Sequence, residues 1–135
     1  MTQEEKQLLL KDLCARLPYG VIVEYGCKHE GKDLGEKQSK LTGRMIDSFF
    51  GSIPIGMSEV YSLQPYLRPM SSMSEDEEIE FCMTVFDTVL RITEKKHTCL
   101  VSFEQINWLN AHHFDYRGLI EKGLALEAPE GMYNI

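Results

Sequence analysis

The sequence predicts an α+β fold: an N-terminal helix, a small curled antiparallel sheet, an amphipathic helix, and a short C-terminal helix with a docked tail. Two observations carry this prediction. Capped segments with helical spacing of apolar residues stand near both ends, whereas residues 19–70 hold seven of the ten glycines and several short strand-like runs. With 135 residues, 43% of them hydrophobic and 26% charged, a single domain over residues 1–135 can bury a core without disulfides or a metal.

The first helix has a clear beginning and end. Thr2 and Glu5 have the spacing of a capping box, in which each side chain binds the backbone N–H of the other residue. Pro18 ends the helix, because proline pushes the residue before it out of the α region. Between them lies one apolar stripe, made of Leu9, Leu10, Leu13, Cys14 and Leu17.

The middle of the chain predicts strands. Residues 19–25 (YGVIVEY) form the first, and residues 26–40, which are polar and glycine-rich, form a strand end followed by a loop or wide hairpin. Residues 41–50 and 52–55 are predicted as further strands around a turn or bulge at Gly51, and residues 60–67 as the last strand, bent at Pro65. Four or five such strands between helices favour a curled sheet, of which an SH3-like barrel is one form.

Two helices follow the strands. Ser74 and Glu77 form a second capping box, and the acidic first turn complements the positive end of the helix dipole. The apolar stripe of this helix consists of Ile79, Cys82, Met83, Phe86, Val89 and Leu90. Ser102 and Gln105 cap a third helix that ends near His112, and residues 98–101 are a candidate edge strand. After it, Gly123 is the expected C′ residue of one helical turn, and the leucines around this turn are expected to fasten the tail to the core.

Charge and cysteine spacing restrict the function. The net charge is -7, and five carboxylates fall within residues 75–80, so nonspecific binding to nucleic acid is disfavoured. No run of residues approaches the roughly 18 to 20 apolar residues of a membrane span, and the N-terminus is charged rather than signal-like. The four cysteines have neither zinc-ribbon nor disulfide-framework spacing: they are Cys14, Cys27, Cys82 and Cys99. A cytoplasmic protein with free thiols is expected, with Cys14 and Cys82 inside the core.

Residues 108–130 are the richest in candidate functional side chains. The candidates for partner binding are Trp108, His112, His113, Asp115, Tyr116 and Arg117, all residues of anchoring or polar type close to one another in the chain. Adjacent histidines point about 100° apart on a helix, so His112 and His113 lack the i, i+4 spacing of a helical metal-binding pair. The favoured interpretation is structural: one histidine packs on an apolar face, the other caps the helix end, and Asp115 and Arg117 form an ion pair beside a phenol. No catalytic residue, metal or cofactor is assigned.

Three blocks of the sequence resemble a family of short proteins encoded by gut Bacteroidetes and their prophages. The blocks are LLLKDLCARLPYGVIV, PYLRPMSSMSEDEE and NWLNAHHFDYRGLIEKGLALEAPEGMYN, which together cover about half of the chain. The resemblance implies a bacterial or phage protein of the cytoplasm. It carries no activity, cofactor or catalytic residue over to this chain.

Three functions remain open at this point. The favoured one is a non-catalytic protein-binding, adaptor or regulatory domain, for which exposure of Trp108 and Tyr116 is the deciding observation. The second is a nucleic-acid-associated regulator that binds through five basic residues of the strand region, namely Lys28, Lys32, Lys37, Lys40 and Arg44. The same region contains the acids Glu30, Asp33 and Glu36, so the net excess of positive charge is two. The third is a small enzyme, which would require His112, His113, Asp115 and Arg117 to converge in one pocket.

Overall fold

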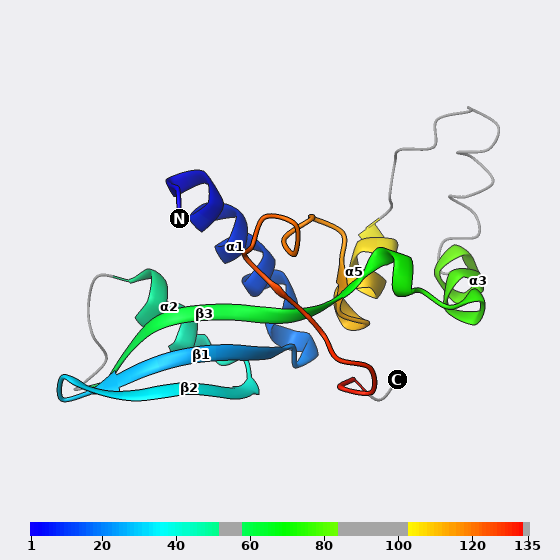
Figure 1. Ribbon diagram of the computed structural model, residues 1–135. Coiled ribbons are helices and arrows are strands. Elements are labelled where there is room, and N and C mark those ends of the chain that lie inside the picture. The colour runs from blue at the N-terminus through cyan, green and yellow to red at the C-terminus, as the bar shows by residue number, and fades with distance from the viewer. Residues whose placement is uncertain (52–57, 84–102, 134–135) are drawn as a thin grey trace.

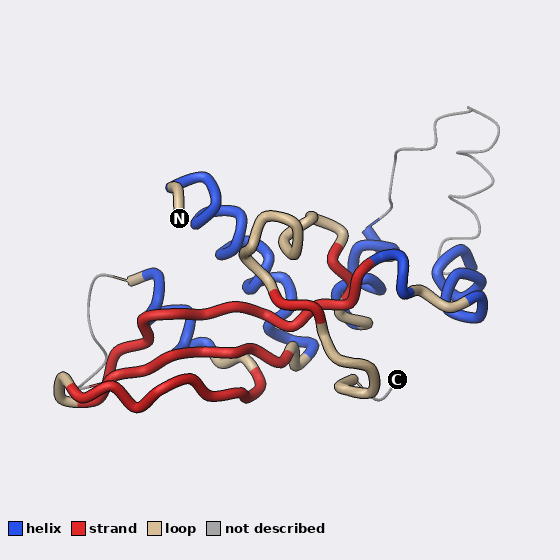
Figure 2. Tube along the Cα trace, viewed as in Figure 1, coloured by secondary structure: helices blue, strands red, loops and turns tan. Residues whose placement is uncertain are grey.

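A long strand connects the two parts of the molecule in the computed structural model (Figure 1), which describes residues 1–51, 58–83 and 103–133. The elements are α1 (Gln3–Arg16), η1 (Leu17–Tyr19), β1 (Ile22–His29), β2 (Lys32–Lys40), α2 (Gly43–Phe50), β3 (Ser58–Pro69), η2 (Met70–Ser72), α3 (Glu75–Met83), α5 (Phe103–Ala111), β4 (Phe114–Asp115) and β5 (Leu126–Glu127). At one end β3 pairs with the β1–β2 hairpin, and at the other it leads into η2 and α3 beside α5 (Figure 2).

The described strands form one mixed, open sheet. Its order is β2-β1-β3-β4, with β5 paired to β3 outside this path. β1 is antiparallel to both of its neighbours, whereas β4 and β5 are parallel to β3. The polar residue Glu24 lies opposite Gln38 on one side and Gln64 on the other, so all three occupy one polar face of the sheet.

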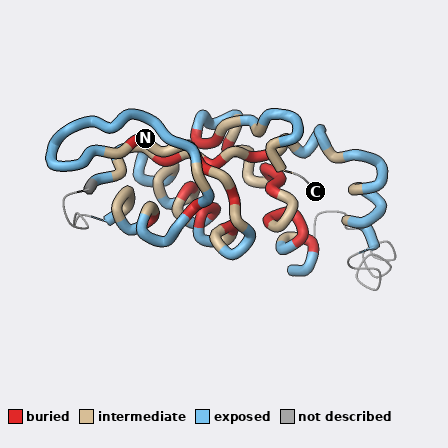
Figure 3. The backbone as a smooth tube through the Cα atoms, turned by 90° about the horizontal axis from the view of Figure 1, so that it is seen from below, coloured by how far each residue is buried: buried red, intermediate tan, exposed pale blue. Residues whose placement is uncertain are grey.

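The opposite face of the sheet carries the main core. There α1 and α2 pack on β1 and β3, and the turn before β5 closes the end of the core (Figure 3). The buried members of this cluster are Leu9, Leu13, Val21, Val23, Leu41, Ile46, Leu63, Leu67, Leu119, Leu124 and Ala125. A second, smaller cluster of Trp108, Leu109 and Phe114 joins α5 and β4 to α3.

Several predicted elements are confirmed. The Thr2–Glu5 capping box is present, with N···O distances of 3.0 and 3.1 Å, and α1 ends at Arg16, two residues before Pro18. The Ser74–Glu77 box begins α3, with distances of 3.1 and 3.2 Å. The third predicted helix is present as α5, although its predicted cap, Ser102, lies outside the described residues.

The tail is also docked as predicted. Gly123, with φ of 73°, is the C′ residue of a Schellman motif. In this motif its N–H donates to the Ile120 carbonyl at 3.1 Å, and the N–H of Leu124 donates to the Leu119 carbonyl at 2.9 Å. Farther on, the Tyr133 hydroxyl donates to the Tyr66 carbonyl at 2.7 Å. These contacts hold the tail across β3.

The strand prediction for residues 41–50 is wrong, because this segment forms α2. Thr42 caps the helix by accepting a hydrogen bond from the N–H of Met45 at 3.3 Å. Ile46 enters the core, and Met45, Phe49 and Phe50 pack against its edge at helical spacing. For residues 26–40 the hairpin alternative of the prediction is confirmed: β1 continues to His29 and β2 runs back antiparallel to it from Lys32 to Lys40, with a register shift between Gly26 and Lys28.

Two further corrections concern closure and thiols. The described strands form an open sheet, so the SH3-like barrel is not confirmed. Cys14 and Cys82 are exposed rather than buried in the core, because the buried face of α1 also contains the polar residues Asp12 and Arg16 and is rotated away from Cys14. The predicted strands at 52–55 and 98–101 and the later half of the acidic helix lie outside the described residues. In the part of the chain that is described, no helix is long and apolar enough to cross a membrane.

Candidate partner-binding site

The six residues predicted for partner binding lie at the end of α5, on β4 and in the turn that follows. Trp108, His113 and Asp115 are buried, whereas His112, Tyr116 and Arg117 are partly exposed. The structure brings Trp108 together with His112, and Tyr116 together with Arg117, but the six side chains do not converge in one pocket.

Trp108 connects α5 to α3. Its ring lies 5.4 Å from that of Phe81 and 4.0 Å from that of His112, measured between centroids, and it is stacked on the latter. Its Nε1 donates to Glu80 Oε1 at 3.3 Å. Since Trp108 is only 9% exposed, it belongs to the core rather than to a partner surface.

Asp115 fixes the turn that leads to the tail. Its two carboxylate oxygens accept hydrogen bonds from the backbone N–H groups of Leu119 at 2.9 Å and Ile120 at 3.0 Å. The carboxylate therefore satisfies two donors at the start of a helical turn, as an N-cap residue does. The sequence predicted an ion pair between Asp115 and Arg117, and this prediction is wrong.

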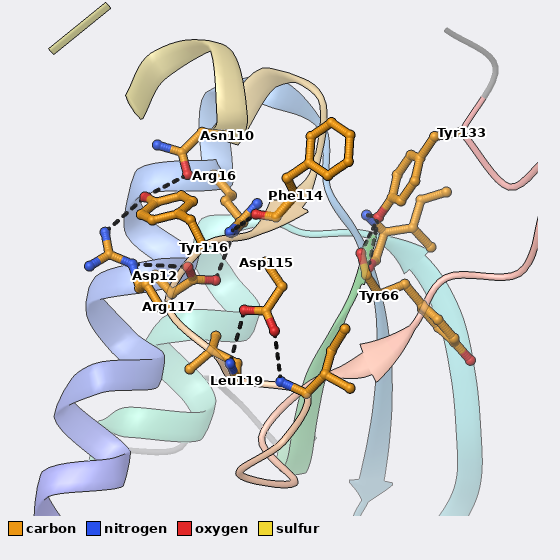
Figure 4. A network of polar contacts seen from close by, with 12 residues as sticks. Asp12, Arg16, Tyr66, Asn110, Phe114, Asp115, Tyr116, Arg117, Leu119 and Tyr133 are labelled. Atoms are coloured by element: carbon orange, nitrogen blue, oxygen red, sulfur yellow. Dashed lines mark hydrogen bonds and ion pairs between the residues drawn. The ribbon is translucent and has the colours of Figure 1, made fainter. Parts of the chain in front are cut away.

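The partner of Arg117 is Asp12, on the first helix (Figure 4). The carboxylate of Asp12 accepts from Arg117 Nε at 3.1 Å and from Arg16 Nε at 2.8 Å, and both Asp12 and Arg16 are fully buried. Arg16 Nη2 donates to the carbonyl of Phe114 at 2.6 Å. One carboxylate thus joins α1 to the C-terminal segment through two guanidinium groups.

Tyr116 extends this network at its outer side. Its hydroxyl donates to Asn110 Oδ1 at 2.9 Å and accepts from Arg117 Nη2 at 3.0 Å. The guanidinium groups of Arg16 and Arg117 lie 5.3 and 4.9 Å from the centre of its ring, within the range of cation–π contacts. Tyr116 therefore acts as a structural member of the network, as the sequence interpretation favoured.

His113 occupies the C′ position after α5. Its φ is 65°, and its N–H donates to the carbonyl of Asn110 at 3.2 Å. Its ring stacks on Tyr133 with 3.8 Å between centroids. Burial, together with the nearby positive charge of Arg16, lowers the pKa of His113 to about 4, so the imidazole is neutral at pH 7.

We expect His113 to make the fold sensitive to mild acid. The imidazole takes up a proton near pH 6.5 in the unfolded chain but only near pH 4 in the folded chain. The free energy of unfolding is therefore highest above pH 6.5 and decreases as the pH is lowered from 6.5 to 4. The slope approaches about 1.4 kcal/mol per pH unit for one proton. His113→Asn, which keeps a residue that tolerates positive φ, should flatten it, as measured by urea unfolding at several pH values.

His112 gives the matched comparison for this experiment. Its pKa is also lowered by burial, although the carboxylates of Glu80 and Glu77 oppose that shift. A His112→Asn variant should therefore retain the larger part of the pH dependence. If His113→Asn leaves the slope between pH 6.5 and 4 unchanged, another group is responsible for it.

Arg68 attaches α3 to the end of β3. Its Nη1 and Nη2 each donate to one carboxylate oxygen of Glu77, both at 2.7 Å, and its guanidinium carbon lies 4.1 Å from the centre of the Phe114 ring. This bidentate pair holds the pKa of Glu77 at about 2. A cleft of about 770 Å³ opens beside the pair, between α3 and the tail, and its lining includes the carboxylates of Asp76, Glu80, Glu127 and Glu130.

An exposed apolar surface lies on the other side of α3 and includes Cys82, which the sequence predicted inside the core. A shallow groove of about 830 Å³, here called the α3 groove, is lined by Met70, Met73, Glu75, Glu78, Ile79, Phe81, Cys82 and Met83. Ile79 is 63% exposed and Met83 60%. Met73 and Phe81 form its floor, since both pack against the Trp108 cluster. The apolar stripe of α3 indicated this face in the sequence, but helical periodicity alone does not tell whether a face meets the core or solvent.

No family model, curated protein or solved structure matches this chain. Function is therefore inferred from the residues themselves. Among the described residues, no three histidine, cysteine or acidic side chains are placed to hold a metal ion. The five basic residues considered for nucleic-acid binding lie on β1, β2 and α2, and Glu30, Asp33 and Glu36 are interspersed among them in the hairpin.

Proposed function

We propose that this chain is a non-catalytic protein-binding domain and that a partner protein binds in the α3 groove. The exposure of Ile79 and Met83 on one helical face carries the proposal. A contiguous apolar surface with a polar rim is typical of an interaction site, because exposing it to water without a partner is unfavourable.

The way in which α3 is attached supports this assignment. The face of α3 that carries Glu77, Glu80 and Phe81 contacts Arg68 and the Trp108 cluster, so the packing needs of the helix are met on that side. The face with Ile79 and Met83 has no packing partner in the part of the chain that the structure describes. Neither residue belongs to the core of α1, α2 and the sheet.

The contacts of the C-terminal segment favour binding over catalysis. An enzyme built on this segment would need its polar side chains to converge. Instead, His113 stacks on Tyr133, Asp115 caps the following turn, and Arg117 pairs with Asp12. Their positions are accounted for by the fold.

We further propose a bacterial or phage protein of the cytoplasm. The three sequence blocks that resemble proteins of gut Bacteroidetes and their prophages support the origin. The free thiols of Cys14, Cys27 and Cys82 are in keeping with a reducing compartment.

The test compares proteins captured from a Bacteroidetes lysate by three immobilised baits. These are the unchanged chain, the double variant Ile79→Ser with Met83→Ser, and a control variant, Lys122→Ser, which alters an exposed residue of the tail. A groove partner should be recovered with the first and third baits and at least about tenfold less with the second, because two apolar contacts of about 1.5–3 kcal/mol each are lost.

The double variant should unfold at the same temperature as the unchanged chain, since both altered side chains are exposed. This control separates lost binding from lost structure. Recovery of the same proteins in the same amounts with all three baits would remove the groove as the binding site.

A further inference from the structure

We infer that the partner segment in the α3 groove is an amphipathic helix with basic residues beside its apolar face. This inference rests on the proposed function and adds the chemistry of the occupant. Three features of the groove argue for it: the charge of its rim, the unbranched methionine side chains in its lining, and the helical elements that line it.

The rim of the groove is acidic, and neither of the two carboxylates that line it is neutralised by a described residue. Residues 70–83 contain five carboxylates and no lysine, arginine or histidine. Glu77 is occupied by Arg68, and Glu80 accepts the Trp108 hydrogen bond. Glu75 and Glu78, which line the groove, have no ion-pair partner among the described residues. A partner that brings positive charge to this rim gains attraction and faster association.

The acids also give the groove a direction. Glu75 lies three positions before Glu78 and four before Ile79, and Cys82 lies four positions after Glu78 and three after Ile79, so the four residues form one stripe along α3. The carboxylates lie at its beginning and the exposed apolar side chains at its end. The matching occupant brings basic residues of its flank to Glu75 and Glu78 and lays its apolar face over Ile79 and Met83.

The backbone around the groove favours a helix over an extended segment. An extended peptide binds mainly by adding to a free strand edge, and the groove is lined by η2 and α3 instead. A helix satisfies its own N–H and C=O groups and presents only side chains. Met70, Met73 and Met83 supply unbranched, adaptable side chains that accept apolar residues of different shapes.

The same charges disfavour a second copy of this chain as the occupant. Two copies that met through α3 would bring Glu75 and Glu78 of each chain toward the same acids of the other, with no described lysine or arginine on η2 or α3 to offset them. Like charges at an interface cost affinity. An anionic membrane surface or a nucleic acid meets the same repulsion.

The experiment uses three tryptophan-free synthetic helical peptides of about 20 residues, long enough to form helix on binding. The first has leucines on one face flanked by lysines, the second replaces each lysine with glutamate, and the third keeps the composition of the first in an order without an apolar face. Binding is followed by the fluorescence of Trp108, the only tryptophan, whose ring lies 5.4 Å from that of Phe81 in the groove floor.

We expect the lysine peptide to bind about tenfold more tightly than the glutamate peptide at low salt, with the difference shrinking as salt is added. Glu75→Gln with Glu78→Gln should remove most of that difference and leave apolar binding. Ile79→Ser with Met83→Ser should abolish binding of the lysine peptide.

Each other outcome overturns a defined part of the argument. Equal binding of the lysine and glutamate peptides would show that the occupant need not be basic, while the groove would still be the binding site. Equal binding of the third peptide, or no binding at all, overturns the groove as well. A dimer in light scattering that the Ile79→Ser, Met83→Ser variant dissociates shows that a second copy is the occupant. A lower unfolding temperature of that variant shows that the chain covers the groove itself.

Discussion

Asp12→Ala is expected to lower the free energy of unfolding by about 3–5 kcal/mol, a large part of the stability of a domain of this size. The substitution leaves the fully buried guanidinium of Arg16 without its carboxylate. It also releases Arg117, so the ion pair between α1 and the C-terminal segment is lost. A buried charge without a partner retains its desolvation cost, and this cost dominates the effect.

Urea unfolding followed by circular dichroism measures this loss. The matched control is Asp47→Ala, which removes an exposed aspartate from α2 and should change stability by less than about 0.5 kcal/mol. In a second variant, Asp12→Leu is combined with Arg16→Met, which removes both fully buried charges and leaves Arg117 able to reach solvent. It should be more stable than Asp12→Ala alone. If the double variant is less stable than Asp12→Ala, the ion pair between Asp12 and Arg16 stabilises the fold by more than the neutralisation of two buried charges.

Local chemistry explains which elements the sequence predicts well. The capping boxes at Thr2 and Ser74 depend on residues three positions apart, and the stop before Pro18 depends on immediate neighbours. Such signals are complete within a short stretch of chain. Alternating apolar residues at 21 and 23 likewise predict a strand with one buried face, which is the face that packs on α1.

The wrong predictions arise where distant residues decide the outcome. Residues 43–50 include Gly43, Phe49 and Phe50, residue types that do not favour a helix, and the packing of Ile46 against the core outweighs that local preference. The partner of Arg117 lies 105 positions away on α1, so the neighbouring Asp115 was the more plausible partner in the sequence. The α3 groove could not be predicted for the same reason. The apolar stripe of α3 specifies an apolar face, but distant residues decide whether that face meets the core or solvent.

Leu119→Ala is the second substitution expected to have a large effect, with a loss of about 2–5 kcal/mol in the free energy of unfolding. Leu119 is fully buried in the main core, and its N–H donates to Asp115, so the residue is held by its side chain and by its backbone.

Shortening Leu119 leaves a cavity at the point where the tail enters the core, and Leu124 and Ala125 depend on that anchor. Lys122→Ala, in the same turn but exposed, should cost less than about 0.5 kcal/mol. A chain that ends after Arg117 loses all of these contacts and should not fold cooperatively in thermal unfolding. If Leu119→Ala costs no more than Lys122→Ala, the tail lies on the surface without closing the core. The C-terminal segment would then not anchor the fold, because the turn held by the buried carboxylate of Asp115 would not contribute to stability.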